Sequence, residues 1–277
     1  MFQYAAGRAL ACNLHTDVVV DDALLREKRY RVTPRRLELF GFPVAARLAS
    51  AVEKGNIRRQ TSPTRRLLAK FGGGGSPSRV FRDVGYSFQP ALLQRPDMTI
   101  LDGYWQSEKY FKAIESVIAE EFDVQMLEDS RAADIRDRIR ATTSVGVHIR
   151  RGDYIANPRA SAFHGELEFD YYRRALELVD AKIGRARRFV FSDDPLWVAD
   201  HFDITGEFIN VSAIRLNAIE ELVLMKACHH QVIANSSFSW WGAWLNPQRN
   251  KIVVAPAKWF RGAQQPTDLL PAGWCSV

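Results

Sequence analysis

Two neighbouring arginines, Arg150 and Arg151, follow an apolar stretch in the segment VHIRRGDY. Guanidinium groups keep their charge and present fork-shaped donors, which suits them to a diphosphate and to the negative charge that develops when a sugar–phosphate bond breaks. His148 points away from the face of Ile149 by strand alternation, so it either contacts a base, orders the arginines or packs as a core residue. The segment predicts an anion site, with a surface salt bridge as the structural alternative.

A second polar cluster, Ser192-Asp193-Asp194-Pro195, also follows an apolar run. One alternative is a helix start, with a capping side chain and proline in the first turn. The other is that Asp193 or Asp194 accepts hydrogen bonds from the amino group and ring N–H of guanine. The cluster lacks an Asp-x-Asp spacing, so we predict no metal ion here.

A third cluster runs from Asn235 to Trp244 with the sequence NSSFSWWGAW. Ser236 and Ser237 would open a helix and present hydroxyl and backbone N–H donors to a phosphate, with the helix dipole adding to the attraction. We expect the tryptophans to pack in the core or to shape a sugar pocket.

From about residue 140 onward, short apolar runs rich in β-branched residues alternate with segments of helical period. The predicted strands are Ser144–Ile149, Arg188–Phe191, Phe208–Val211, Gln231–Ala234 and Ile252–Ala255. The predicted crossover helices include Phe169–Asp180 and Asn217–Cys228. This alternation predicts a doubly wound parallel sheet, in which ligands bind beyond the carboxyl ends of the strands. All three polar clusters fall at such ends.

The front half contains a predicted helix at Phe2–Asn13, a predicted strand at Asp17–Asp21 and, at Met98–Trp105, a predicted strand that enters a helix, which favours a second α/β lobe. Arginine pairs and prolines between residues 22 and 95 indicate loops and short helices. We interpret the tetraglycine Gly72–Gly75 as a flexible connection, because a phosphate-binding loop needs a preceding strand and a following helix. We therefore predict lobes at residues 1–135 and 136–277.

Composition is that of an ordinary globular protein, since 47% of the 277 residues are hydrophobic and 25% are charged. The chain has no apolar run of membrane-spanning length and no signal-peptide pattern at its start, so we expect a cytoplasmic protein. Its three cysteines fit neither a disulfide framework nor a zinc site.

The net charge of +6 arises from residues 1–80, where 15 basic residues outnumber 6 acidic ones. Such a basic surface suits membrane headgroups, an anionic glycan carrier, nucleic acid or simple solvation. Since no nucleic-acid module is recognisable, we predict no nucleic-acid partner.

Together, these clusters resemble glycosyltransferase family 11, the bacterial galactoside α-1,2-fucosyltransferases, which share motifs with α-1,6- and protein O-fucosyltransferases. The matching segments are MFQYAAGRALA, DGYWQSEKYF, VHIRRGDY, FSDDP, NAIEELVLMKAC, VIANSSFSWWGAWLN and VVAPAKWF. They cover the chain except for about residues 22–95.

The resemblance implies an α/β fold of the glycosyltransferase-B type, with two Rossmann-like lobes that contain parallel sheets. Its activity would be the inverting transfer of L-fucose from GDP-β-L-fucose to the 2-hydroxyl of a terminal galactoside in a surface glycan. The front lobe would bind the acceptor and the back lobe GDP-fucose, with no metal or other cofactor. The implied setting is polysaccharide biosynthesis in the cytoplasm, with peripheral contact to the inner membrane as an option.

The resemblance also assigns roles to individual residues. Arg150 would bind the diphosphate and stabilise the leaving GDP, and Arg151 would support it. The remaining donor-binding residues would be His148, Asp193 or Asp194 at guanine and Asn235, Ser236, Ser237 and Phe238 around the phosphates.

Inversion requires one displacement, in which a base takes the proton from the galactose hydroxyl as the anomeric bond opens. Asp153 is the first candidate for that base, with Glu166, His164 and Asp102 as rivals. Family members usually have a strand and a GGLGNQ-like turn before the segment seen here as MFQYA. The resemblance therefore implies an incomplete front lobe and leaves two alternatives: an active enzyme, or a truncated and catalytically weak GDP-sugar-binding remnant.

Overall fold

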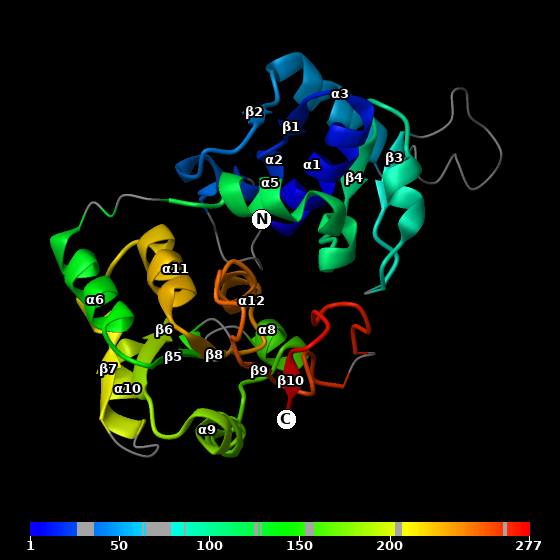
Figure 1. The fold of residues 1–277 in the computed structure, drawn as a ribbon. Coiled ribbons are helices and arrows are strands. Elements are labelled where there is room, and N and C mark those ends of the chain that lie inside the picture. Colours follow the sequence, from blue (N-terminus) through cyan, green and yellow to red (C-terminus); the bar gives the residue numbers. More distant parts are fainter. Residues whose placement is uncertain are drawn as a thin grey trace. The chain divides into compact units, whose positions relative to one another are not determined.

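The computed structural model describes residues 1–26, 36–62, 64, 79–85, 87–124, 127, 129–152, 158–202, 207–262 and 265–277. The chain divides into unit 1, Met1–Phe122 with Pro266–Pro271, and unit 2, Asp123–Gln265 with Ala272–Val277. Both units combine helices with strands, and every strand pair among the described residues is parallel (Figure 1). This confirms the predicted α/β class with parallel sheets. None of the described helices is long and apolar enough to cross a membrane.

Unit 2 is built on one six-stranded sheet. Its strands are β5 (Ser144–Ile149), β6 (Arg187–Ser192), β7 (Phe208–Asn210), β8 (His230–Val232), β9 (Val253–Ala255) and β10 (Cys275–Ser276). Across the sheet the order is β7-β6-β5-β8-β9-β10. Numbered from the first strand of the unit, this is the order 3-2-1-4-5-6 of a dinucleotide-binding sheet. The predicted doubly wound sheet is therefore confirmed.

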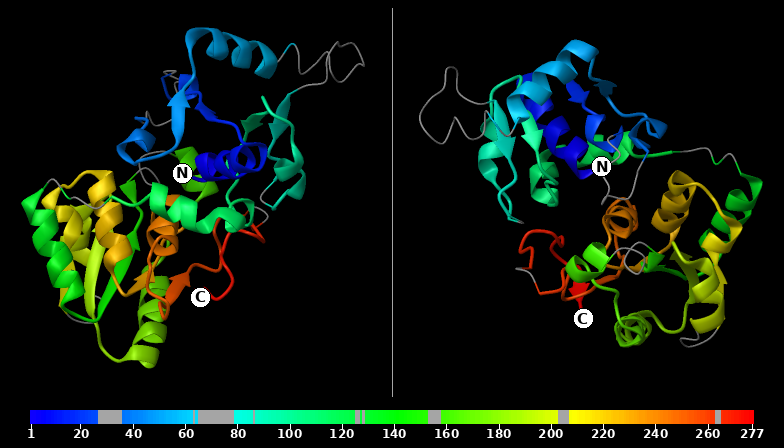
Figure 2. Two further views of the ribbon diagram at one scale, coloured as in Figure 1. Left: turned by 45° about the horizontal axis from the view of Figure 1, so that its top comes forward. Right: turned by 180° about the vertical axis from the view of Figure 1, so that it is seen from behind.

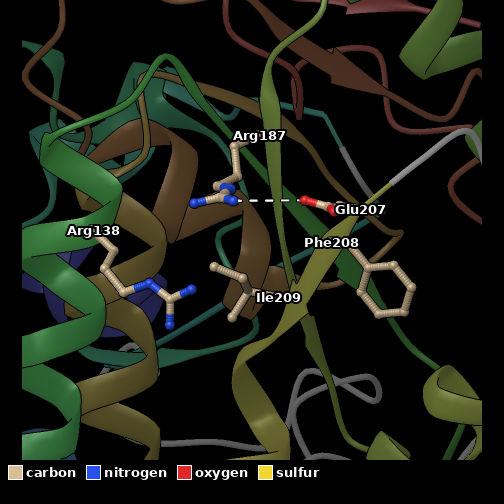
Figure 3. A pocket seen from close by; sticks show the side chains of 5 residues that line it. All are labelled: Arg138, Arg187, Glu207, Phe208 and Ile209. Carbon is tan, nitrogen blue, oxygen red and sulfur yellow. Dashed lines mark ion pairs between the residues drawn. The ribbon is translucent and has the colours of Figure 1, made fainter.

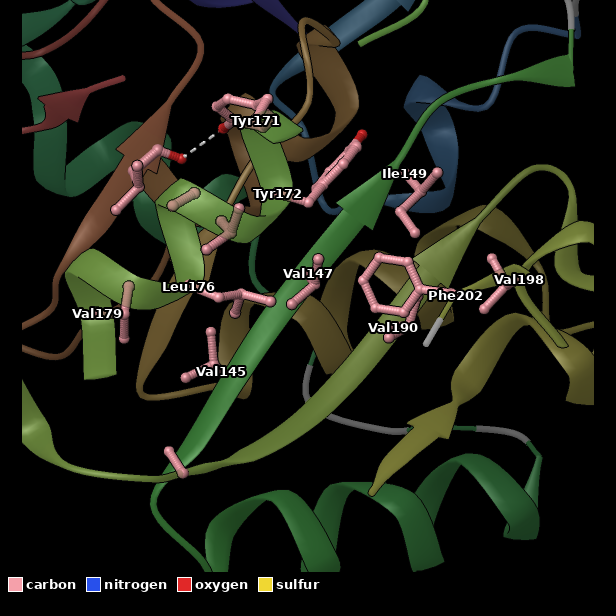
Figure 4. Close-up of a cluster of buried hydrophobic side chains, with 14 residues drawn as sticks. Val145, Val147, Ile149, Tyr171, Tyr172, Leu176, Val179, Val190, Val198 and Phe202 are labelled. Carbon is pink, nitrogen blue, oxygen red and sulfur yellow. Dashed lines mark hydrogen bonds between the residues drawn. The ribbon is translucent and has the colours of Figure 1, made fainter. Parts of the chain in front are cut away.

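Helices cover both faces of this sheet, and two further views in Figure 2 show the same layers. They are α6 (Ser130–Arg140), α8 (Pro158–Phe163), α9 (Phe169–Ile183), α10 (Pro195–His201), α11 (Ala218–Ala227) and α12 (Ser237–Trp244), with the 3-10 turn η5 at Val211–Ile214. On one face, Val145, Val147 and Ile149 of β5 pack against α9 through residues such as Leu176 and Val179 (Figure 4). Alternation along the strands turns other side chains to the opposite face.

That opposite face is covered by α6 and α11. Phe189 and Phe191 of β6 pack with Ile135 of α6 and Leu224 of α11 in a second core cluster. Burying each of these side chains contributes about 1.5–3 kcal/mol. Gly146 also faces this layer, and a Cβ atom there would lie 3.1 Å from the sulfur of Cys228. The glycine therefore lets the helix layer approach the central strand.

The boundary between the units lies between Phe122 and Asp123 rather than between residues 135 and 136. The reason is α6, whose apolar side chains Ala132, Ile135 and Ile139 pack on the sheet of unit 2. A second difference from the predicted boundaries is that Pro266–Pro271 belongs to unit 1. Its Asp268 accepts a hydrogen bond from the backbone N–H of Phe88 at 2.8 Å.

Unit 1 contains short elements. Its helices are α1 (Phe2–Leu14), α2 (Ala23–Arg26), α3 (Ala51–Thr61) and α5 (Glu115–Glu121); its strands are β1 (Val18–Val20), β2 (Ala46–Leu48), β3 (Val80–Arg82) and β4 (Ile100–Asp102); its 3-10 turns are η1 (Leu39–Gly41), η2 (Pro90–Gln94), η3 (Glu108–Tyr110) and η4 (Lys112–Ile114). Among the described residues, the strands form two separate pairs, β1 with β2 and β3 with β4. The tetraglycine Gly72–Gly75 lies outside the described residues.

Three polar side chains tie α1 to α5 inside unit 1. The Tyr4 hydroxyl donates to Glu121 at 2.5 Å, and Nε of Arg8 donates to the same carboxylate at 2.9 Å. The Tyr4 oxygen in turn accepts the backbone N–H of Ala45. Because Tyr4 and Glu121 are buried, loss of either partner would leave a buried polar group without its hydrogen bond.

Candidate active site

The strand order of unit 2 creates a switch point between its two central strands. The chain leaves β5 toward β6 and β7, and later crosses to β8 on the other side of β5. In such a sheet the loops after the two central strands diverge and leave a crevice at the carboxyl edge. Here the loop after β5 begins with Arg150, and the one after β8 contains Asn235 and Ser236. Two of the three predicted clusters thus flank this crevice.

Asp193, at the end of β6, holds the arginine loop. Its Oδ2 atom pairs with Nη1 of Arg150 at 3.0 Å, and its Oδ1 atom accepts the backbone N–H of Arg151 at 2.9 Å. A Cβ atom added to Gly152 would lie 2.9 Å from the same carboxylate, so the glycine permits this approach. One carboxylate therefore fixes both the guanidinium and the backbone that carries it.

The side chain of Arg151 is enclosed by three groups. It forms an ion pair with Glu166, its Nε lies 3.7 Å from Oδ2 of Asp194, and its guanidinium carbon sits 3.9 Å from the ring centroid of Trp197. Cation–π contact with a tryptophan adds to the charge pairing. These contacts fit a supporting role for Arg151.

Asp194 begins the helix that follows β6. Its Oδ1 atom accepts the backbone N–H of Trp197 at 3.2 Å, while Oγ of Ser192 accepts the backbone N–H of Asp194 at 3.0 Å. Pro195 occupies the first turn of α10. The capping alternative therefore holds for Asp194, whereas Asp193 serves the arginine loop. A role of either residue at guanine stays a prediction.

His148 is buried on the face covered by α11 and α12. Its ring centroid lies 5.5 Å from that of Phe238, and within the described part of the chain its Nδ1 atom has no hydrogen-bond partner. Burial lowers the pKa of His148 to about 3, and the positive charge of Arg150 adds to this effect. The imidazole is therefore neutral at physiological pH.

The segment after β8 combines a buried amide with an open helix start. Asn235 donates through Nδ2 to the carbonyls of His164, Gly165 and Trp259 at 3.0 to 3.2 Å. Ser236 is the N-cap of α12, but its side chain makes no capping hydrogen bond. Ser237 is exposed and Phe238 half-buried at the first turn. Asn235 thus positions the loops, and the two serines lie where an anion would meet the helix N-terminus.

The tryptophans of α12 are core residues, as predicted. Trp240, Trp241 and Trp244 are buried. Gly242 lets α12 lie close to α11, because a Cβ atom there would be 2.5 Å from the sulfur of Met225. This packing fixes the helix whose first turn faces the crevice.

One residue at this edge, Glu221 in the first turn of α11, was not predicted. Its pKa is raised to about 7, chiefly because burial disfavours the charged form; a hydrogen bond with the Ser212 side chain opposes the rise, and the nearby charge of Asp193 adds to it. Its neighbour Glu220 accepts backbone N–H groups of Asn217 and Asp129 and so has a structural task. The sequence NAIEEL shows two glutamates at a helix start, but only tertiary packing distinguishes their environments.

The candidate bases are not brought together. Asp153 lies outside the described residues. Glu166 pairs with Arg151, and the backbone carbonyl of His164 accepts from Asn235. Asp102 belongs to unit 1, where its Oδ2 atom pairs with Nε of Arg82 at 3.0 Å. The assignment of the base stays a prediction.

Two hollows of about 370 Å³ mark opposite ends of the unit 2 sheet. The first adjoins the arginine loop and is lined by Arg150, Arg151, Glu166, Phe169, Tyr172 and Trp197, among others. The second lies at the amino ends of β6 and β7, where Arg138 and Arg187 face Glu207, Phe208 and Ile209 (Figure 3). Because ligands of such sheets bind at the carboxyl edge, the first hollow belongs to the candidate site.

Within the described ranges, no group of three or more His, Cys, Asp or Glu side chains is arranged to hold a metal ion. A metal-free reaction stays a prediction.

Comparison with known proteins identifies the family. The profile of Glycosyl transferase family 11 matches residues 94–274. The O-antigen biosynthesis glycosyltransferase WbnK of Escherichia coli is 34% identical over 95% of this chain and 91% of its own length. An α-1,2-colitosyltransferase of Escherichia coli is 36% identical over 63% of this chain and 61% of its own. A galactoside 2-α-L-fucosyltransferase of Caenorhabditis elegans is 26% identical over 70% of this chain and 57% of its own.

A solved structure of POFUT1 in complex with GDP is a distant neighbour, with a TM-score of 0.39 and 12% identity over 91% of this chain and 93% of that one. A likeness this low assigns nothing to the present chain. The profile match covers the arginine loop, Asp193 and the start of α12, and the similarity to WbnK extends over nearly the whole chain. The chain is a glycosyltransferase and belongs to Glycosyl transferase family 11.

Proposed function

We propose that this protein is an α-1,2-fucosyltransferase, which moves L-fucose from GDP-β-L-fucose to the 2-hydroxyl of a terminal galactoside in a surface glycan, with inversion at the anomeric carbon. One observation carries the proposal: the switch point of the unit 2 sheet places the Arg150 loop and the first turn of α12 around one crevice. Permanent positive charge on one side and free helix N–H groups on the other suit a nucleoside diphosphate. The names of the relatives, which include a fucosyltransferase and an O-antigen enzyme, support the sugar class.

In this proposal Arg150 stabilises the leaving group. As the bond between the anomeric carbon and the phosphate oxygen breaks, GDP takes the electron pair and the negative charge on its terminal phosphate grows. Asp193 occupies one side of the Arg150 guanidinium at 3.0 Å and fixes its orientation, while a guanidinium carries five N–H donors in all. A preorganised donor of this kind is worth about 10²–10³-fold in rate.

We assign recognition of the base to His148 and Glu221. Guanine presents N–H donors at its ring and amino group, and these need an acceptor such as a carboxylate. Asp193 and Asp194 are engaged by the arginine loop and by α10, whereas Glu221 is a half-buried carboxyl at the same edge. Neutral His148 beside Phe238 would complete the base pocket. Asp193 and Asp194, which the sequence offered as candidates for guanine binding, then have positioning roles. Asp193 holds the arginine loop, and Asp194 caps α10.

The acceptor hydroxyl must lose its proton during the same displacement. We keep Asp153 as the proposed base, with Glu166, His164 and Asp102 as rivals. The Glu166 carboxylate is already paired with the Arg151 guanidinium, which weighs against that rival.

The decisive experiment measures transfer of labelled fucose from GDP-fucose to lactose in the presence of EDTA. We expect transfer by the native chain and a loss of at least about 10²-fold in Arg150→Ala. Arg187→Ala is the matched control, because Arg187 lies at the amino edge of the same sheet and pairs with exposed Glu207. Equal rates in the Arg150 and Arg187 variants would refute the role of Arg150, and activity that EDTA abolishes would refute the metal-free mechanism.

A second candidate donor carries colitose, the 3-deoxy analogue of fucose, since an α-1,2-colitosyltransferase is 36% identical to this chain over 178 residues. Parallel assays with the GDP derivatives of both sugars distinguish the two. A higher kcat/KM with GDP-colitose would replace fucose by colitose in the proposal and leave the site unchanged. Peripheral contact of the basic front with anionic membranes remains a separate proposal, which sedimentation with anionic vesicles tests.

A further inference from the structure

Two large apolar side chains are exposed at the carboxyl edge of the β3–β4 pair in unit 1. The strands pair in parallel with Arg82 opposite Asp102. Val84 and Tyr104 each lie two residues beyond that pair, and they are 78% and 70% exposed. Both therefore sit at the end of the strands where ligands of parallel sheets bind.

The backbone that carries Tyr104 is held rigidly. Oδ2 of Asp83 accepts the backbone N–H groups of Tyr104 and Trp105 at 3.2 and 3.0 Å, and its Oδ1 atom accepts from the side chain of Gln89. A Cβ atom on Gly103 would lie 2.2 Å from the Cβ atom of Asp83. The glycine allows the two strand ends to approach, and the carboxylate then locks the turn.

The next residue, Trp105, is in a left-handed conformation with a φ of 55°. Its side chain is fully buried, stacked on Phe81 at 5.7 Å and edge-on to Tyr110 at 5.6 Å. A bulky residue at positive φ is strained and persists only where its surroundings impose it. The buried indole anchors the turn, and the adjacent Tyr104 ring is directed outward.

A charged pair lies two residues before Val84 and Tyr104 on the two strands. Arg82 and Asp102 form an exposed ion pair at 3.0 Å at the ends of β3 and β4. An amphipathic aromatic ring beside charged donors and acceptors matches a sugar, whose C–H face packs on the ring while its hydroxyls meet the charges. A phosphate has no C–H face that could pack on the exposed ring.

We propose that Tyr104, with Val84 and the Arg82–Asp102 pair, forms a saccharide-binding surface that takes the acceptor glycan. The assignment of this saccharide as the acceptor rests on the proposed transferase function, whereas saccharide binding itself does not. Tyr104 is then a determinant of acceptor affinity.

The test compares Tyr104→Ala, Tyr104→Trp and the control Val52→Ala, whose side chain is 75% exposed on α3 of the same unit. With lactose as the probe, we expect Tyr104→Ala to raise the KM for lactose by about fivefold to tenfold. The KM for GDP-fucose and the thermal midpoint should not change. Tyr104→Trp should restore the KM for lactose, which a merely structural role would not require.

A KM for lactose within twofold of native in Tyr104→Ala would overturn the inference. If the native chain transfers no fucose, the proposed function fails, and saturation-transfer NMR with lactose still decides the inference. Signals that are lost in Tyr104→Ala but kept in Val52→Ala support it. Equal signals in both variants, or no binding by the native chain, overturn it.

Discussion

The carboxyl edges of the two units are held in different ways. In unit 2, the end of β5 is fixed by charge, since Asp193 pairs with Arg150 and the Arg151 guanidinium is enclosed by carboxylates and Trp197. In unit 1, the end of β4 is fixed by backbone hydrogen bonds to Asp83 and by the close contact at Gly103. The first arrangement prepares positive charge for an anion. The second leaves an exposed, uncharged ring suited to a neutral sugar.

This difference predicts which perturbations each edge tolerates. An edge held by ion pairs should lose its geometry when one charge is removed, even where the backbone is undisturbed. An edge held by steric contact should be destabilised by one added methyl group. The following substitutions test that contrast, in order of decreasing expected effect.

Gly103→Ala should lower the free energy of unfolding by about 3 kcal/mol, because the new Cβ atom would meet Asp83 at 2.2 Å. Gly55→Ala is the control, since a Cβ atom at this position in α3 meets nothing within 4 Å. It should stabilise the helix by up to about 1 kcal/mol. Urea unfolding measures the change in the free energy of unfolding of each variant. Equal changes in the two variants would contradict the steric role of Gly103.

Asp193→Ala should reduce kcat by about 10²-fold, since it releases both Arg150 and the backbone N–H of Arg151. Asp193→Asn keeps an acceptor for that N–H and should recover part of the rate. Steady-state transfer assays measure both variants. Full activity in Asp193→Ala would show that charge pairing does not hold this edge.

Glu221→Gln should stabilise the protein at pH 8 by about 2 kcal/mol and have little effect at pH 4. The pKa of Glu221 rises from 4.5 to about 7 on folding, so ionisation of this carboxyl disfavours the folded state. The free energy of unfolding therefore falls as pH rises from about 4.5 to 7. Glutamine stays neutral and escapes this penalty.

The same variant should bind GDP more weakly, because the acceptor for the guanine N–H groups is impaired. Unfolding curves at pH 4 and pH 8, with GDP titration at pH 8, give both quantities. A variant that gains stability without losing GDP affinity would remove Glu221 from the base pocket.

Trp197→Leu should produce the smallest change, a rise of about threefold to fivefold in the KM for GDP-fucose. It removes the cation–π contact at 3.9 Å but leaves the ion pair of Arg151 with Glu166. High salt should enlarge the effect, since salt weakens the remaining charge pairing. An unchanged KM at every salt concentration would assign Trp197 to packing alone.

The sheet of unit 2 was predictable because its signals are local. The predicted strand Ser144–Ile149 coincides with β5, and the segment around Arg188–Phe191 extends by one residue at each end in β6. Apolar runs and the polar residues that follow them mark each carboxyl end. The arginine and serine clusters could therefore be placed on one edge before any contact was known.

Unit 1 was less predictable because its order depends on contacts between distant segments. The predicted strand at Met98–Trp105 is reduced to Ile100–Asp102, and the turn beyond it is shaped by Asp83 and the buried Trp105. Helix α3, which opens with a capping box of Ser50 and Glu53, lies where we expected loops and short helices. Glu221 was missed for the same reason, since its burial is a tertiary property.

The path of the C-terminal residues limits how the protein can be dissected. The chain leaves unit 2 after Gln265, contributes Pro266–Pro271 to unit 1 and returns to add β10 to the unit 2 sheet. No single cut separates the two units, and a fragment that starts at Asp123 carries a segment whose partners Phe88 and Lys109 it lacks. During synthesis, β10 is made after the other five strands of the unit 2 sheet, so this edge of the sheet pairs only after Cys275 and Ser276 have left the ribosome.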